Sequence, residues 1–439
     1  MSDALLSVEA AQATVLAGVE ALADTETLAP DDALGRVLAG TVVAVTSLPP
    51  WDSSAMDGYA IRAGDLRTAT DAKPVRLTVV GEVRAGQAPD ARVLSDTAVR
   101  IATGARIPPG ANAVVPVEMT TPLGESGSPG SRGRAVAGLL PAACLVHEVV
   151  PIGHAIRLAG SSIKAGVEAV RAGETITPAM VAIVSGTGAA SISVRRRPVV
   201  ALLMVGDEIR AAGTDPGPVG VPDAIGPGLR ALVREAGAVA LDLGIADDRL
   251  EDVAERLRRG VAEADLVVVS GGVSVGPHDV VRNAFDAIGH MNLWRVAIQP
   301  GKPFAFGRAD ADGRAAPVLL FGLPGNPVAS FVTFELFVRP VIRRLAGHAT
   351  LHRAVDRGAL EEPVTKGVGR RCYEPVISLR DDAGTPIRDA AGRVRVRLSG
   401  RPGSHGLSAL ATADALAVIP ETALRAEAGS EVELRWLDR

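Results

Sequence analysis

Residues 196–346 alternate continuous apolar runs with amphipathic segments, and this is the most regular pattern in the chain. The runs RPVVALLMV, VALDLGI, ADLVVVSGG, LWRVAI and PVLLFGLPG are typical of parallel strands buried on both faces. Between them, Val253, Leu257 and Val261 recur at the spacing of one helical face. The pattern therefore predicts a doubly wound α/β domain with a parallel sheet.

The flanking regions differ in texture. Residues 5–46 are expected to be largely helical, whereas residues 47–151 hold short β-like runs separated by Gly/Pro turns. We expect a multidomain α/β plus β fold with four parts: an N-terminal mixed helical domain of residues 1–46 and 152–194, an inserted small β domain of residues 47–151, the doubly wound parallel-sheet domain of residues 195–348, and a C-terminal β-barrel-like domain of residues 349–439.

Composition excludes several classes of protein. The 439 residues are 47% hydrophobic, enough for large cores, yet no run approaches the roughly 20 apolar residues of a membrane helix. The first residues lack the basic start of a signal peptide, so a cytoplasmic protein is expected. The net charge of −4 without a basic block argues against nucleic-acid binding. Cys144 and Cys372, the two cysteines, provide neither a disulfide framework nor a zinc cluster.

The carboxyl ends of the predicted strands are polar or glycine-rich. They read Gly206-Asp207-Glu208, then Asp247-Asp248, then SGGVSVG (270–276) followed by Asp279, and finally GLPGNP (322–327). Ligands of open α/β sheets bind beyond these strand ends, where exposed N–H groups suit phosphate and carboxylates suit Mg²⁺. The sequence thus favours a phosphorylated ligand held with a divalent cation.

Each of these residues also has a simpler interpretation. Asp247, Asp248 or Asp279 could cap the helix that follows, whereas no helical pattern follows Glu208. Lys302 is one of only four lysines and lies between two prolines in an expected rigid turn. A compact point charge at that position indicates an anion contact, although a solvated surface lysine is the alternative.

Six strings then occur in order: DSSAMDGYA (52–60), IATGA (101–105), GDE (206–208), SGGVSVG, PGKPFAFG (300–307) and GLPGNPV. Together they closely resemble the molybdopterin molybdenumtransferases, which include the gephyrin E domain, over essentially the whole chain. The resemblance implies an elongated homodimer that converts adenylylated molybdopterin and molybdate to molybdenum cofactor, releasing AMP with the help of Mg²⁺. It also implies a site between the α/β domain of one subunit and the β domains of its partner.

The same resemblance assigns roles to particular residues. For Asp57, the alternative without the family is a turn before Gly58. The implied catalytic residues are Asp57, Glu208, Asp247 and Lys302; the implied metal ligands are Glu208, Asp247 and Asp279; and the implied substrate-binding residues are Thr103, Gly271, Gly272, Ser274, Gly276, Pro324, Asn326, Pro327 and Ser404.

Several residues depart from the family pattern. Ser162, Ile225, Gln299, Ala329 and Pro375 stand where a carboxylate, an asparagine, a lysine, a serine and an arginine are expected, and Arg295 replaces a second lysine. Each cation lost from an anion site removes about 1.5–3 kcal/mol of charge-assisted hydrogen bonding. Two hypotheses follow: an active molybdenum-inserting enzyme, or a divergent paralogue that binds pterin or nucleotide without inserting metal. A gephyrin-like scaffold would have only the low-complexity loop at 122–138 as its surface.

Overall fold

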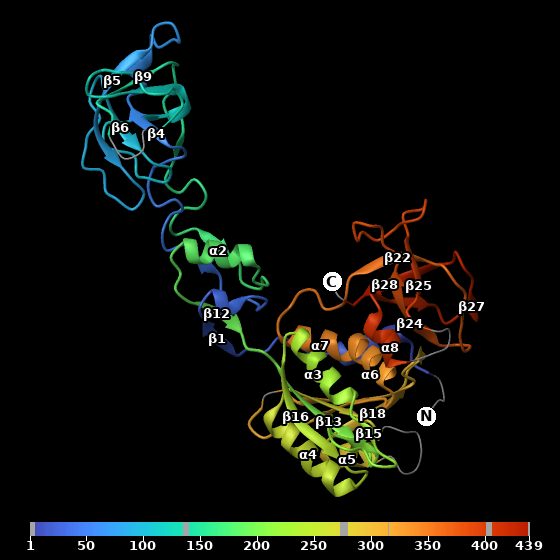
Figure 1. Cartoon of the computed structure of the whole chain (residues 1–439). Coiled ribbons are helices and arrows are strands. Elements are labelled where there is room, and N and C mark those ends of the chain that lie inside the picture. Colours follow the sequence, from blue (N-terminus) through green and yellow to red (C-terminus); the bar gives the residue numbers. More distant parts are fainter. Residues whose placement is uncertain (1–4, 135–139, 273–279, 315, 401–405, 438–439) are drawn as a thin grey trace.

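A computed structural model describes residues 5–134, 140–272, 280–314, 316–400 and 406–437. The molecule is elongated, with a β domain at one end and the α/β domain together with a C-terminal barrel at the other (Figure 1). A slender middle region carries α2 (Pro178–Gly186), β1 (Thr25–Leu28) and β12 (Ile192–Arg195). The expected fold class is confirmed.

The α/β domain is built on one six-stranded sheet. Its order is β16 (Val239–Ala246), β13 (Val199–Val205), β17 (Leu266–Ser270), β21 (Val318–Leu323), β20 (Pro303–Ala309) and β18 (His290–Arg295). The first four strands are parallel. Strand β20 runs antiparallel to β21 and β18 runs antiparallel to β20, so β18 has the same direction as the first four strands.

One expectation for this sheet was wrong. The run LWRVAI does not form a buried parallel strand, because β18 ends at Arg295 and pairs antiparallel with β20 at the sheet edge. The segment that begins at Pro303 forms β20, a strand that was not predicted, and it lies between β18 and the parallel strands. An apolar run does not specify which strand it pairs with, so the pattern alone could not reveal the intervening strand.

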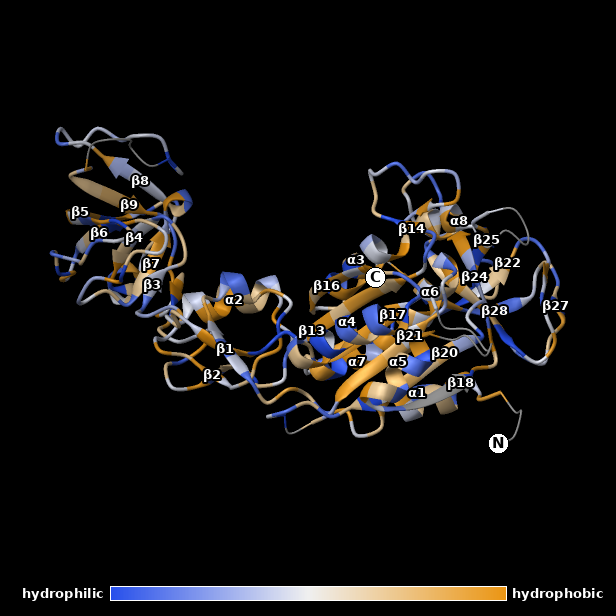
Figure 2. Cartoon of the chain, turned by 90° about the horizontal axis from the view of Figure 1, so that it is seen from below, coloured by the Kyte–Doolittle hydropathy of each residue, from blue (hydrophilic) through white to orange (hydrophobic). Residues whose placement is uncertain are grey.

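Helices cover both faces of the sheet, as a doubly wound domain requires. One face packs against α1 (Val8–Leu16), α3 (Ile225–Glu235), α6 (Pro327–Thr333), the π-helical turn η4 (Phe334–Val338) and α7 (Arg339–Leu345). The other face packs against α4 (Leu250–Glu263) and α5 (Val280–Ile288). Figure 2 shows the apolar strands enclosed between these helices. Within the described ranges, no helix has the length and apolarity to cross a bilayer.

The first 46 residues are less helical than expected. After α1 comes only a 3-10 turn, η1 (Asp31–Ala33), while β1 and β2 (Val42–Val43) are extended. Gly35 adopts φ +74, which breaks the helical pattern of DDALGRVLAG. Strands of this segment pair with strands of residues 152–194, and α1 packs against the α/β domain.

The inserted domain is a six-stranded sheet. Its order is β7 (Ala113–Pro116), β4 (Gly58–Ile61), β6 (Thr97–Ile101), β5 (Val75–Val83), β9 (Ala143–Val146) and β8 (Thr120–Leu123). A Cβ atom on Gly58 would lie 2.0 Å from the Val115 carbonyl oxygen, so only glycine allows β4 and β7 to approach this closely. Two 3-10 turns, η2 (Ala63–Leu66) and η3 (Val117–Met119), complete the domain.

The C-terminal domain is a closed five-stranded barrel. Its strands are β24 (Arg371–Ser378), β25 (Val394–Leu398), β22 (Val355–Leu360), β28 (Glu431–Trp436) and β26 (Ala415–Ile419), and β26 returns to β24. Strand β19 (Ile298–Gln299) adds to β24 and joins the barrel to the α/β domain, and α8 (Leu407–Thr412) lies beside α6.

Short two-stranded ribbons complete the fold. They are β1 with β12, β2 with β11 (Glu168–Val170), β3 (Ser53–Ser54) with β10 (Ile156–Arg157), β14 (Ile209–Arg210) with β15 (Val221–Pro222), and β23 (Val364–Thr365) with β27 (Arg425–Ala426).

The aromatic core beneath β20 and β21 should dominate the stability of the α/β domain. Phe321 is fully buried, with its ring centroid 5.0 Å from that of Phe306 and 6.1 Å from that of Phe304. We expect Phe321→Ala to lower the free energy of unfolding by about 3–5 kcal/mol in urea denaturation, because it leaves a cavity. Leu250→Ala, at a side chain 41% exposed, is the control and should have little effect. A comparable loss in both variants would contradict this account.

Candidate functional site

Four strand ends meet at one edge of the α/β sheet. Because β16, β13, β17 and β21 are parallel neighbours, the loops that follow them leave the sheet on the same side. The last two loops contact each other directly: the Ser270 hydroxyl donates to the Pro324 carbonyl oxygen at 3.1 Å, and the Gly271 N–H donates to the Leu323 carbonyl oxygen at 3.4 Å. The edge therefore forms one continuous surface.

An aspartate pair ties the loops after β13 and β16 together. The Asp248 N–H donates to Asp207 Oδ1 at 2.9 Å, and the Asp207 N–H donates to Asp248 Oδ2 at 3.3 Å. The side chains of these two residues are thus occupied in fixing the loops. Their neighbours Glu208 and Asp247 are exposed, and no hydrogen bond or ion pair engages either carboxylate within the part of the chain that is described.

The helix-cap alternative fails for the second of these loops. The N-cap of α4 is Arg249, which makes no side-chain cap hydrogen bond, so neither Asp247 nor Asp248 caps this helix. Glu208 is followed by the short strand β14, in agreement with the absence of a helical pattern after it. Both carboxylates remain available at the sheet edge.

The glycines after β17 allow two backbones to approach closely. A Cβ atom on Gly271 would lie 2.1 Å from the Val205 carbonyl oxygen, and φ values of +90 and +62 at Gly271 and Gly272 favour glycine. Gly325 packs against Gly271 from the next loop. The predicted Ser274, Gly276 and Asp279 lie outside the described residues, as does Ser404.

The start of α6 forms the rim beside these glycines. Asn326 is the N-cap, and its Oδ1 accepts from the Ala329 N–H at 3.2 Å, with Pro327 in the first turn. Behind it, the buried Ser330 hydroxyl lies 3.3 Å from that of Ser270. A helix start of this kind presents backbone N–H groups and the positive end of the helix dipole.

Lys302 lies at the same edge. Since Ala305 of β20 is paired with Gly322 of the antiparallel β21, the start of β20 is beside the carboxyl end of β21. Gly301 adopts φ +113 and packs against Thr333 of α6, which fixes the backbone before the exposed lysine. The sheet edge thus combines two carboxylates, glycine loops, a helix start and one cation.

The inserted domain holds the remaining predicted pair. Asp57 Oδ1 accepts from the Thr103 N–H at 2.7 Å and from the Thr103 hydroxyl at 2.8 Å. Asp57 therefore bridges two loops of the sheet and does not form a local turn before Gly58. These two hydrogen bonds lower the pKa of Asp57 below its ordinary value, against a smaller opposing effect of burial.

Within one chain, the two halves of the predicted site are far apart. The middle region separates the domain of β4 and β6 from the α/β sheet, in both views (Figures 1 and 2). Among the described residues, no three His, Cys, Asp or Glu side chains gather to hold a metal ion. At the described part of the edge, Glu208 and Asp247 are the carboxylates with neither oxygen engaged by a described residue, whereas Asp207 and Asp248 each use one oxygen to fix the loops.

The departures from the family pattern have structural explanations in most cases. Gln299 Oε1 accepts from the Gly367 N–H at 3.1 Å, which connects the site edge to the barrel. Ile225 belongs to the core beneath α3, and Ala329 is buried in α6. Pro375 is buried in β24 opposite Leu416. Ser162 is exposed in the middle region.

Two arginines precede Pro375 in the barrel and differ in their availability. Arg371 binds Glu421 at 3.0 Å and also Glu9, so it is already paired. The Arg370 guanidinium lies over Gly367: a Cβ atom on this glycine would be 2.6 Å from Arg370 Nη2 and 3.2 Å from Gln299 Oε1. Arg370 therefore places a cation beside Gln299, the position of the missing lysine.

The fold and the strand-end loops define a doubly wound α/β ligand-binding protein with an inserted β domain and a C-terminal barrel. Family models match three consecutive regions: the MoeA N-terminal region (domain I and II) over residues 6–188, a probable molybdopterin binding domain over 201–344, and the MoeA C-terminal region (domain IV) over 357–435. The chain belongs to the MoeA, or molybdopterin molybdenumtransferase, family, as its motifs predicted.

Individual relatives agree over nearly the full length. The chain is 35% identical to molybdopterin molybdenumtransferase 2 of Mycobacterium tuberculosis, over 92% of each chain. It is 29% identical to the molybdopterin molybdenumtransferase of Haemophilus influenzae, over 98% of each. The crystal structure of a molybdopterin biosynthesis MoeA protein from Pyrococcus horikoshii superimposes with a TM-score of 0.77 at 28% identity, covering 99% of both chains.

The lowered pKa of Asp57 predicts a specific pH dependence. A carboxyl whose folded pKa is depressed stabilises the fold above its unfolded pKa, and this contribution is lost as the pH falls through the folded pKa. We expect the difference in Tm between the wild type and Asp57→Asn to be greatest above about pH 5 and to shrink below about pH 4. In a Thr103→Val background, which lacks one donor, the pH-dependent part should be smaller. A difference that grows as the pH falls would contradict the assigned hydrogen bonds.

Proposed function

We propose that this protein takes part in molybdenum cofactor biosynthesis by inserting molybdate into adenylylated molybdopterin, with release of AMP and with the assistance of Mg²⁺. Support for a transferase role comes from relatives named molybdopterin molybdenumtransferase that match over 92% and 98% of the chain. The observation that carries the proposal is the gathering of Glu208, Asp247 and Lys302 with the glycine loops at one sheet edge.

The chemistry of the substrates fits this edge. An adenylate pyrophosphate and a molybdate dianion are both strongly negative, so a site for them needs backbone N–H donors and fixed cations. The start of α6, the Gly271–Gly272 turn and Lys302 supply these groups. Lys302 would orient the anion as a point charge, while the loop N–H groups would stabilise charge that develops on the departing phosphate.

The residues present also suit magnesium. Mg²⁺ is commonly held by one or two carboxylates together with substrate phosphates, and the Glu208 and Asp247 carboxylates are exposed and unpaired within the described ranges. Asp279 is the third proposed ligand and lies outside those ranges. When bound, the metal would neutralise the phosphoanhydride and polarise it for cleavage.

The proposal includes a two-fold homodimer with shared sites. Asp57 and Thr103 lie at the opposite end of the elongated chain from the sheet edge, so they could meet a substrate bound there only in a second copy (Figure 1). A two-fold axis would form two identical sites, each with the α/β edge of one subunit and the inserted domain of the other.

The second candidate function is binding of pterin or nucleotide without turnover. The observation that favours it is the loss of two expected cations, at Gln299 and Pro375. Arg370 argues against it, because its guanidinium returns a positive charge beside Gln299. Incubation of the purified protein with adenylylated molybdopterin, Mg²⁺ and molybdate separates the two functions: AMP release with cofactor formation supports the enzyme, and tight binding without turnover supports the binding protein.

Mixed dimers test the shared site directly. Asp57→Asn and Glu208→Gln should each abolish most AMP release as homodimers. After unfolding and refolding of the two variants together, half of the dimers should be mixed and should carry one intact site of two, which restores about a quarter of the wild-type activity. A mixture that stays as inactive as each variant alone would contradict a site formed across the dimer.

Arg370 should contribute to the use of molybdate. Loss of one charge-assisted contact of about 1.5–3 kcal/mol should raise the apparent KM for molybdate about 10- to 100-fold in Arg370→Gln. Affinity for the adenylylated pterin should change little. Arg397→Gln, at an exposed arginine of β25 for which the described structure has no bonding partner, is the matched control. Equal effects of both substitutions would rule out a specific role for Arg370.

A further inference from the structure

A second polar cavity lies at the opposite edge of the α/β sheet from the candidate site. It has a volume of about 190 Å³ and is lined by residues 34–37 and 195–197 together with Arg234, Glu235, Gly237, Ala346 and His348. These segments precede β13, follow α3 and follow α7, so the cavity is located where the middle region joins the α/β domain. None of the residues proposed for molybdenum insertion lines it.

The lining is strongly basic. Arg36, Arg195, Arg196, Arg197 and Arg234 contribute to it, and the one carboxylate in the lining belongs to Glu235. This carboxylate is already neutralised, because Arg353 donates to its two oxygens at 2.8 and 2.7 Å. Arg36 and Arg196 are also ion-paired, with Glu26 and with Asp24 and Asp265. Within the described residues, the lining arginines without a carboxylate partner are therefore Arg195, Arg197 and Arg234.

Three of the five arginines have structural roles. Arg196 binds Asp265 through two hydrogen bonds of 2.9 and 3.0 Å. Arg36 is buried and donates to Glu26 and to the Arg195 carbonyl oxygen, and Arg195 donates to the Leu22 carbonyl oxygen. These contacts hold the walls in place and fix their charges near the cavity.

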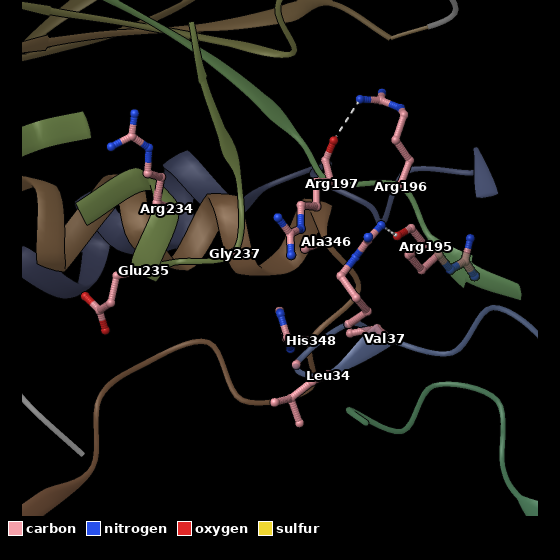
Figure 3. Close-up of a pocket in the computed structure, with 12 residues that line it drawn as sticks. Leu34, Val37, Arg195, Arg196, Arg197, Arg234, Glu235, Gly237, Ala346 and His348 are labelled. Atoms are coloured by element: carbon pink, nitrogen blue, oxygen red, sulfur yellow. Dashed lines mark hydrogen bonds between the residues drawn. The ribbon is translucent and has the colours of Figure 1, made fainter. Parts of the chain in front are cut away.

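Arg197 and Arg234 have no bonding partner in the described portion of the chain. Figure 3 shows the Arg197 side chain extending into the cavity towards His348, whereas the Arg234 guanidinium points away from it. Arg197 thus leaves a free planar set of donors inside a cavity that already holds other cations. A planar set of unpaired donors at the mouth of a polar cavity suits a bidentate contact to an oxyanion.

His348 adds a neutral polar group to the cavity lining. Its side chain is buried, and Nδ1 lies 3.1 Å from the Thr175 hydroxyl, so Nε2 is the ring nitrogen left to face another partner. Burial, together with Arg343 and Arg339, lowers its pKa to about 4. The imidazole is therefore uncharged at neutral pH and can donate or accept a hydrogen bond without adding to the positive charge.

We propose that this cavity is a binding site for a small tetrahedral oxyanion, with Arg197 as its principal ligand. A volume of about 190 Å³ leaves room for phosphate, sulfate or molybdate. The bound anion would connect the middle region to the ends of α3 and α7. It would thereby brace the joint that sets the direction of the inserted domain.

Cations at helix ends offer a simpler explanation for part of this cluster. The carboxyl ends of α3 and α7 point to the cavity, and positive side chains are favourable there. This explanation accounts for Arg234 and for Arg343 and Arg344 in the last turns. It does not account for Arg197, which belongs to neither helix and has no acceptor among the described residues.

Equilibrium dialysis of the full chain against phosphate, sulfate and molybdate tests the site. Wild type is expected to bind one anion per chain at this cavity, and Arg197→Gln should weaken that binding about tenfold or more. Arg197→Lys, which keeps the charge but loses the planar fork, should have an intermediate affinity. Arg197 is exposed and unpaired, so neither substitution removes a contact that supports folding.

Arg258→Gln is the matched control, because Arg258 is an exposed arginine of α4 for which no partner occurs in the described ranges. It should bind all three anions as the wild type does. Loss of binding in Arg197→Gln for any one anion supports the site and identifies its ligand. Molybdate that binds at the sheet edge instead should still bind to this variant. Absence of saturable binding, or unchanged binding of all three anions to Arg197→Gln, would overturn the proposal.

Discussion

The parallel pairing of β16, β13, β17 and β21 is the constraint on which the candidate site depends. Parallel neighbours deliver all four following loops to one edge, whatever the loops contain. The loops then need little further positioning. The backbone N–H groups of Asp207 and Asp248 bind the opposite carboxylates, and Gly325 packs on Gly271. The side chains left free of these structural contacts, Glu208 and Asp247, are the ones proposed to act on a ligand.

Separation along the chain is the second constraint. The inserted domain has its own hydrophobic core, in which Tyr59, Ile61 and Leu77 are buried, so it does not rely on the α/β domain for its fold. Because the inserted domain has its own core, the Asp57–Thr103 pair can be held far from the α/β sheet of the same chain. The geometry of the middle region therefore sets the position of the Asp57–Thr103 pair relative to the α/β domain. Residues 195–197 connect these two parts of the chain, so their conformation affects that position.

Much of this organisation could be predicted from the sequence, and the failures have physical reasons. Continuous apolar runs and strand-end glycines identified the parallel strands, because burial on both faces leaves a strong pattern. The pairing at the sheet edge was not predictable, since an apolar run such as LWRVAI does not specify its neighbour and β20 begins at a proline, a residue that is depleted in strands. The Asp207–Asp248 pair and the position of Arg370 over Gly367 are tertiary contacts. No local spacing encodes them, although the three consecutive arginines at 195–197 were visible in the sequence.

The two ends of the sheet use charge in different ways, and this difference follows from the backbone. At the carboxyl edge, the start of α6 lies beside the proposed ligand site and supplies a positive dipole, so the proposal requires few charged side chains there besides Lys302 and Arg370. At the opposite edge, α3 and α7 end, and their negative dipole ends cannot hold an anion. The anion site proposed at that edge therefore has to be built from side chains, with Arg197 as its principal ligand.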